Sequence, residues 1–266
     1  MFLGNKYGKI SFMMGKIIAI VNQKGGVGKT TTCVNTAYAL AEAGRRVLLC
    51  DFDPQGNATS GTGLSKNTAP GSYDAVIRLE DPLAAVHKTP YFDVMPAGKN
   101  LSGAEIELTT LPEREHRLRG VLQPLAERYD FILIDCPPSL GMLTLNGLCA
   151  AHSFLVPVQC EYYALEGLSD LLYTVRAVKQ GGLNAGLDLE GVLLTMFDGR
   201  TNLSLQVAEE VKRHFPGKVF KTVVPRNVRL SEAPSHGMPV QKYDPASRGA
   251  DSYDALAAEI IKRNSQ

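Results

Sequence analysis

The sequence is organised around the stretch Lys24-Gly25-Gly26-Val27-Gly28-Lys29-Thr30-Thr31. The apolar run Ile17-Ile18-Ala19-Ile20-Val21 before it predicts a buried strand, and residues 32–40 after it predict a helix. A glycine-rich loop in this context can wrap its backbone around phosphate oxygens, because no side chain blocks the approach. The N–H groups and the dipole of the following helix also favour an anion there. The pattern therefore predicts a triphosphate site, with Lys29 on the outer phosphates and the Thr30 hydroxyl on Mg²⁺.

A second lysine, Lys24, stands immediately before the first glycine, where the usual phosphate loop carries no such residue. One lysine suffices for one triphosphate, so Lys24 is either a surface residue beside a glycine turn or has a second role. With this lysine the stretch resembles the deviant Walker A ATPases, the family that includes the ParA/Soj partition proteins and MinD. The resemblance implies that Lys24 crosses a dimer interface to the partner's nucleotide. It also implies that residues 24–31 bind ATP, with Lys24 and Lys29 both acting in catalysis.

Length and composition favour one globular domain. The chain has 266 residues, of which 44% are apolar and 21% charged, and its formal net charge of +1 gives no overall argument for nucleic acid. No apolar run approaches the roughly 20 residues that a membrane span needs, and residues 1–15 lack the apolar core of a signal peptide. We therefore expect a cytoplasmic protein. Its N-terminal extension would cover residues 1–14, with Met13 or Met14 as alternative starts, and its ATPase domain residues 15–266.

The five cysteines show no metal-binding spacing. They are most simply small buried residues of a protein from a reducing compartment. They are Cys33, Cys50, Cys136, Cys149 and Cys160.

Apolar runs alternate with amphipathic stretches along the chain. Further strands are predicted at 46–51, 91–96, 131–135, 153–158, 189–196 and 219–224, and helices at 72–86, 112–128, 164–180, 203–215 and 251–262. Because the strands are uniformly apolar, they are expected to be buried on both faces. The fold class is therefore α/β: a single P-loop domain with a mostly parallel twisted β-sheet and helices on both faces.

Two further stretches place acidic residues at strand ends. Phe131-Ile132-Leu133-Ile134-Asp135, with the two prolines after it, resembles a Walker B strand, which implies that Asp135 holds Mg²⁺ through a water; an ordinary strand end is the alternative. Asp51-Phe52-Asp53-Pro54-Gln55 resembles the family's switch I. Carboxylates two positions apart on a strand point to one side. The resemblance implies that Asp53 orients the attacking water and that Asp51 supports Mg²⁺ or Lys29. The alternative is an Asp-Pro turn that caps the strand, which would explain Asp53 but not both acids.

The stretch from Thr222 to Gly237 closely resembles the C-terminal signature of ParA/Soj proteins. In that family the proline and the residues just after it line the adenine pocket, so the resemblance assigns Pro225 and Asn227 to ATP binding. The same stretch separates ParA/Soj proteins from MinD and from metabolic relatives.

The segment from position 211 to position 248 is rich in basic residues: it contains eight Lys and Arg residues and only two acidic ones, Glu232 and Asp244. Such a patch would bind DNA phosphates without reading bases, and a dimer would double the contacts. A solvated surface that is clustered only in sequence is the alternative. The predicted DNA-binding residues are Lys212, Arg213, Arg226, Arg229, Lys242 and Arg248.

The resemblance to ParA/Soj covers Gly15 to about Lys262 without a broken motif. It implies an ATPase with weak basal activity, ATP and Mg²⁺ as ligands, and an ATP-bound homodimer on nonspecific double-stranded DNA. It further implies a ParB/Spo0J-like partner, a nucleoid location and no membrane. Three alternatives remain: a MinD-like positioning ATPase on a membrane or protein cargo, a reductase like the nitrogenase iron protein, and a regulatory scaffold. The acids and the short apolar face of the C-terminal helix suit packing against the body better than a bilayer.

Overall fold

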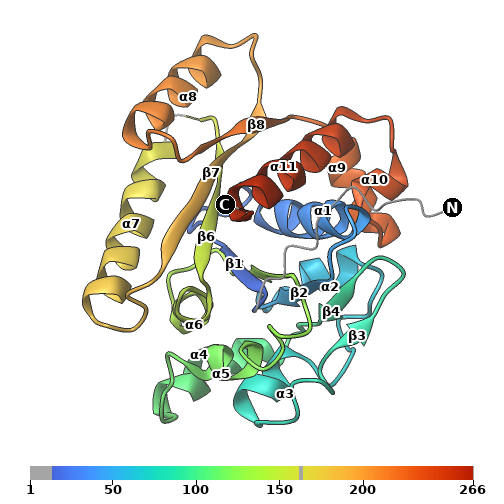
Figure 1. Ribbon diagram of the computed structural model, residues 1–266, viewed down its shortest axis with the longest axis vertical. Helices are drawn as coiled ribbons and strands as arrows, with labels where there is room; N and C mark the ends of the chain where they lie inside the picture. Colours follow the sequence, from blue (N-terminus) through green and yellow to red (C-terminus); the bar gives the residue numbers. More distant parts are fainter. Residues whose placement is uncertain (1–13, 162–163, 266) are drawn as a thin grey trace, which may run out of the picture.

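Eight strands form one sheet in the order β3-β4-β2-β5-β1-β6-β7-β8, with helices on both faces (Figure 1). The computed structural model describes residues 14–161 and 164–265, so the predicted extension lies outside the described residues except for Met14. Neighbouring strands are parallel except for the antiparallel pair β3 and β4. The predicted fold class is therefore confirmed. The strands are β1 (Lys16–Ile20), β2 (Val47–Asp51), β3 (His87–Lys88), β4 (Asp93–Met95), β5 (Phe131–Asp135), β6 (Ser153–Gln159), β7 (Asp188–Phe197) and β8 (Val219–Pro225).

The helices connect these strands and differ widely in length. They are α1 (Lys29–Glu42), α2 (Asn57–Gly61), α3 (Ser72–Ile77), α4 (Leu101–Glu107), α5 (Arg117–Leu122), α6 (Met142–Ala150), α7 (Ala164–Gln180), α8 (Asn202–His214), α9 (Arg229–Glu232), α10 (Val240–Tyr243) and α11 (Arg248–Asn264). Short 3₁₀ turns cover Leu108–Thr110 and Ala233–His236.

Alternate residues of each strand bury into two separate cores, as expected for a parallel sheet covered on both faces. Ile18 and Ile20 of β1 belong to the core under α1 and α11, whereas Ile17 and Ala19 belong to the core under α3 to α8. In Figure 1, α1 and α11 lie together on one side of the sheet, and α4, α6 and α7 lie on the other. The C-terminal helix thus packs against the body through Tyr253, Leu256 and Ile260, as predicted.

The strand register brings three predicted sites to one edge of the sheet. The central strand β1 pairs with β5 so that Ile20 is opposite Asp135, and β2 pairs with β5 so that Asp51 is opposite Asp135. The phosphate loop leaves the same end of β1. Because parallel strands end at a common edge, the loop and both aspartates meet there.

Two predicted helices are much shorter than the sequence pattern indicated. The helix expected over 72–86 ends at Ile77, because Leu79 adopts a positive φ of 56° and Pro82 follows. The helix expected over 112–128 is helical only as α5, because Glu113 adopts φ 50° before it and Pro124 lacks the N–H donor to continue it. The sequence analysis also missed α4 and α6, which lie beside the site described below.

Candidate nucleotide site and basic surface

The glycine-rich loop between β1 and α1 has the backbone that its glycines allow. Gly26 and Gly28 adopt φ values of 76° and 90°, in the left-handed region that residues with a Cβ rarely occupy. The Thr195 hydroxyl of β7 donates to the Val27 carbonyl at 2.8 Å, which ties the loop to the sheet. The helix α1 begins at Lys29, with no side chain capping its first N–H groups. These donors remain available to an anion at the helix start.

Lys29 points from the first turn of α1 into the protein and is only 7% exposed. Its ammonium donates to the Lys24 carbonyl at 3.1 Å. Burial lowers the pKa of Lys29, and the nearby carboxylates of Asp135 and Asp53 oppose that change. Lys29 is therefore a buried cation at the start of a helix, in a position where it can also bind an anion such as a phosphate.

Asp135 is the counterpart of Lys29 at the end of β5. It is completely buried, and neither carboxylate oxygen has a well-formed hydrogen bond among the described residues. Burial raises its pKa well above the usual range, as does the charge of Asp51, whereas the nearby Thr30 hydroxyl and Lys29 lower it. A buried carboxylate that lacks hydrogen-bond partners is a costly arrangement unless a cation completes it. The site therefore fits a hard cation such as Mg²⁺, whose preferred ligands are oxygens.

Asp51 and Asp53 lie close together, but the protein uses them differently. Asp51 Oδ2 accepts hydrogen bonds of 2.7 Å from both the N–H and the hydroxyl of Thr59, and Oδ1 accepts one of 3.2 Å from the Asp53 N–H. Burial raises the pKa of Asp51 to about 6, although these bonds to Thr59 oppose the shift. Among the described residues, the Asp53 carboxylate accepts one hydrogen bond, from the Gln55 N–H at 3.0 Å. Asp51 therefore braces the turn, and Asp53 keeps more of its hydrogen-bonding capacity.

Thr59 was not identified from the sequence. Its hydroxyl also accepts a hydrogen bond of 2.9 Å from the Ala97 N–H, so it links α2, the end of β2 and the loop after β4. A threonine eight positions after Asp51, at the start of a short helix, was the only available signal.

Lys24 is held within its own chain. Its ammonium lies 3.1 Å from Oε2 of Glu161, two residues after β6, and its backbone N–H donates to Asn22 Oδ1 at 2.9 Å. The Gln159 amide also donates to Glu161. The two charged side chains are 34% and 46% exposed. This partner of Lys24 was not predicted, because the two residues are 137 positions apart.

A cavity of about 510 Å³ extends from the phosphate loop to the C-terminal signature. Gly28 and Thr30 line one end, and Pro225 and Asn227 line it from the segment after β8. The fold thus brings together two predicted parts of one site that are almost 200 positions apart in the sequence.

The predicted basic patch is divided by the fold. Arg226 and Arg248 line one open hollow of about 570 Å³ together with Arg200, which the sequence analysis did not include because it precedes the basic segment. Arg200 pairs with Asp198 at 2.8 Å, and this contact, with a smaller contribution from Arg226, lowers the pKa of Asp198 to about 2.

The other predicted DNA contacts have partners of their own. Lys212 and Arg213 pair with glutamates one turn earlier on α8, at 3.0 and 2.6 Å. Arg229 pairs with Glu232 and Asp244, and Lys242 lies over the Tyr38 ring. Of the six predicted DNA-binding residues, Arg226 and Arg248 are therefore the exposed ones for which the described residues provide neither an ion pair nor a ring contact.

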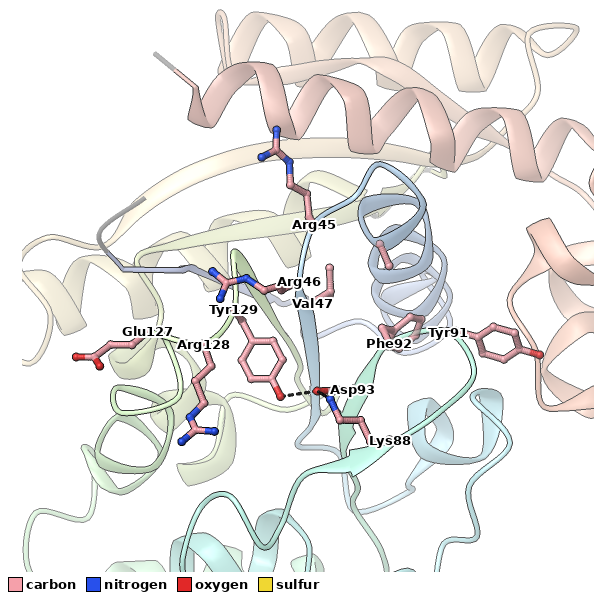
Figure 2. A pocket seen from close by; sticks show the side chains of 11 residues that line it. Arg45, Arg46, Val47, Lys88, Tyr91, Phe92, Asp93, Glu127, Arg128 and Tyr129 are labelled. Carbon is pink, nitrogen blue, oxygen red and sulfur yellow. Dashed lines mark hydrogen bonds and ion pairs between the residues drawn. The ribbon is translucent and has the colours of Figure 1, made fainter. Parts of the chain in front are cut away.

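A second cavity, of about 530 Å³, lies at the opposite edge of the sheet, near the starts of β2 and β5 (Figure 2). Two of the four basic residues that line it form ion pairs: Lys88 pairs with Asp93 at 2.8 Å and Arg46 pairs with Asp130 at 2.9 Å. The Tyr129 hydroxyl also donates to Asp93, which the dashed line in Figure 2 marks. Unlike the first cavity, this one is not lined by any residue of the glycine-rich loop.

Comparison with known proteins gives the family. Residues 15–189 match the family model described as an AAA domain. The chain is 59% identical to the sporulation initiation inhibitor protein Soj of Bacillus subtilis (strain 168), over 93% of this chain and 98% of the relative. The chain belongs to the ParA/Soj family of chromosome-partitioning ATPases.

Two further comparisons add a second ParA relative and a similar solved structure. Identity to the chromosome partitioning protein ParA of Myxococcus xanthus (strain DK1622) is 56%, over 94% of this chain and 89% of the relative. A similar solved structure is that of cobyrinic acid a,c-diamide synthase from Mycobacterium smegmatis with bound ADP and magnesium. It has a TM-score of 0.83 and 38% identity, and covers 95% of this chain and 96% of that one. Within the described part of this ParA/Soj chain, no helix is both long and apolar enough to cross a bilayer.

Proposed function

We propose that this ParA/Soj ATPase binds ATP with Mg²⁺, dimerises in the ATP-bound state and then holds nonspecific double-stranded DNA. With a ParB-like partner it would segregate or position chromosome or plasmid DNA. The observation that carries the proposal is the Asp135 carboxylate beside the glycine loop: it is fully buried and, although Lys29 is near, neither oxygen has a well-formed hydrogen bond among the described residues, which fits a cation held next to a phosphate-binding loop.

The nucleotide would lie in the cavity that joins the glycine loop to the segment after β8. The N–H groups of the loop and Lys29 would hold its phosphates. Pro225 and Asn227 line the far end of the cavity, where the adenine would lie. Mg²⁺ would be held by the Thr30 hydroxyl and, through water, by Asp135, and would neutralise phosphate charge.

Hydrolysis needs a positioned water rather than a strong base, because phosphoryl transfer depends mainly on geometry and charge stabilisation. Asp53 would orient that water, since its carboxylate has only one hydrogen bond to the protein among the described residues. Asp51 would act indirectly, by fixing the turn that carries Asp53.

The link between ATP and DNA would be the dimer. Lys24 would leave Glu161 and contact the phosphates held by the partner subunit, so that ATP favours the paired state. Each subunit offers a few exposed cations, chiefly Arg226 and Arg248, so a monomer would bind DNA weakly. Two subunits double the number of phosphate contacts and raise the affinity by more than twofold.

The test uses the purified chain with Mg²⁺ and a non-hydrolysable ATP analogue. Sedimentation should show a dimer, and a gel shift at low salt should show retention of plasmid DNA. Lys24→Ala should bind the analogue but remain a monomer. A monomer that ignores DNA in the presence of the analogue would contradict the proposal. Co-sedimentation with liposomes instead of DNA retention would favour a MinD-like positioning role.

A further inference from the structure

The first turn of α6 is capped by a carboxylate from another helix. Glu105 of α4 accepts a hydrogen bond from the Met142 N–H at 3.0 Å through one oxygen, and from the Leu143 N–H at 3.1 Å through the other. The residue before α6 is Gly141, which provides no side chain to cap the helix itself. A negative charge is favourable at this end of a helix, where N–H groups have no partners within the helix.

The contact with Glu105, and not the backbone conformation, explains why residue 141 is a glycine. Its φ of −85° is open to any residue. A Cβ added there would lie 1.7 Å from Glu105 Oε1 and 2.9 Å from the carboxyl carbon. Gly141 therefore leaves space for the Glu105 carboxylate, and the two residues together form the N-terminal cap of α6.

The cap formed by Glu105 and Gly141 fixes the start of α6, and α6 in turn contacts the loop that follows Asp135. The loop starts at the end of β5 and runs only from Cys136 to Leu140 before Gly141. The Thr144 hydroxyl, on the first turn of α6, donates to the Ser139 carbonyl at 2.6 Å. The helix also lies close to the loop start, since a Cβ added at Gly147 would lie 2.7 Å from Cys136 Sγ. The position of α6 therefore constrains the residue next to Asp135 and the loop beyond it.

The rest of α6 is anchored independently. The Asn146 side chain donates to the Arg114 carbonyl at 2.7 Å and accepts from the Leu118 N–H at 3.1 Å. Loss of the Glu105 contact should therefore loosen the first turn and its loop while the helix stays attached to α5. The expected consequence is local to the Asp135 side of the nucleotide site.

We infer that Glu105, seated on Gly141, is a positioning residue that sets Asp135 and its loop for metal-dependent nucleotide binding. The inference rests on the proposed function, because it concerns the metal side of that same site. Residues that orient a metal-binding group typically change metal affinity or activity by about 10- to 100-fold when they are replaced. We expect the lower end of this range, because Glu105 bonds to the first turn of α6 and acts on Asp135 only through the loop between them.

The test measures how much Mg²⁺ is needed for half-maximal binding of a fluorescent ATP analogue, with binding in EDTA as the reference. Glu105→Ala should raise the Mg²⁺ half-point about 10-fold, and Gly141→Ala should do the same by displacing the carboxylate. Binding in EDTA should not change for either variant. Glu105→Gln, which retains one carbonyl acceptor, should lie between wild type and Glu105→Ala and keeps the test possible if the alanine variant fails to fold.

The matched control is Glu107→Gln on the same helix. The Glu107 carboxylate accepts from the Tyr73 hydroxyl at 3.1 Å and has no contact with α6 among the described residues. Its Mg²⁺ half-point should equal that of the wild type. The double variant of Glu105→Ala and Gly141→Ala should be no worse than Glu105→Ala alone, because both changes remove one contact.

Two outcomes would overturn the inference. One is an unchanged Mg²⁺ half-point in the Glu105 variants with only a lower melting temperature, which would make the contact merely stabilising. The other is full additivity of the two changes. In either case a wild type that binds the analogue in a Mg²⁺-dependent way leaves the proposed function standing, whereas a wild type that shows no such binding removes both.

Discussion

The contact between Lys24 and Glu161 gives the most direct prediction for dimerisation. If Lys24 leaves Glu161 to reach the partner's nucleotide, each subunit loses an ion pair of 3.1 Å when the dimer forms. The Lys24 and Glu161 side chains are 34% and 46% exposed. Because water screens an exposed ion pair, this one is worth only ~0.2–1 kcal/mol. Glu161→Gln removes this stabilisation from the free subunit. Two subunits together give ~0.4–2 kcal/mol, so the dimer dissociation constant should fall by about 2- to 30-fold.

The assay is sedimentation equilibrium over a range of protein concentrations, with Mg²⁺ and a non-hydrolysable ATP analogue. Glu210→Gln is the matched control, because it removes an ion pair of 2.6 Å with Arg213 on α8. That pair has no contact with the glycine loop, so the control should dimerise like the wild type. The reasoning is refuted if Glu161→Gln dimerises no better than the control. Weaker dimerisation would show instead that Glu161 stabilises the paired state.

Three further predictions concern the metal side, the turn after β2 and the DNA surface. Because burial raises the pKa of Asp135, the nucleotide-free protein loses stability as the pH rises above about 4. The melting temperature of Asp135→Asn should therefore exceed that of the wild type at about pH 8 and equal it near pH 3 to 4, and the variant should lose Mg²⁺-dependent nucleotide binding. A lower melting temperature of the variant at high pH would contradict this. Thr59→Val removes the hydroxyl that donates to Asp51 and should cost about 1–3 kcal/mol in urea unfolding, while Thr59→Ser should cost much less; equal losses would assign the effect to packing. Arg226→Ala should reduce the slope of log affinity for DNA against log salt by about 1 per subunit, and Arg229→Ala by less because two carboxylates already pair with it; the reverse order would place the DNA on the other side of this segment.

The central strands and the glycine loop could be predicted from the sequence because their signals are local. Four apolar residues followed by an aspartate predict a buried strand that ends at the aspartate, and β5 has the predicted bounds, Phe131 to Asp135. The helices over 72–86 and 112–128 were overestimated because Pro82 and Pro124 interrupt runs that otherwise have helical spacing.

The sequence by itself determined which candidate groups the site contains: Lys29, Thr30 and Asp135 occur in motifs that predict a site for phosphate and Mg²⁺. Only the tertiary structure decided what surrounds them. Glu161 contacts Lys24 and Glu105 contacts Gly141 across long sequence separations, and four of the eight basic residues between positions 211 and 248 form ion pairs with nearby carboxylates. The physical reason is that motifs record covalent order, whereas burial, ion pairing and helix capping depend on distances that only the packed sheet and its helices set.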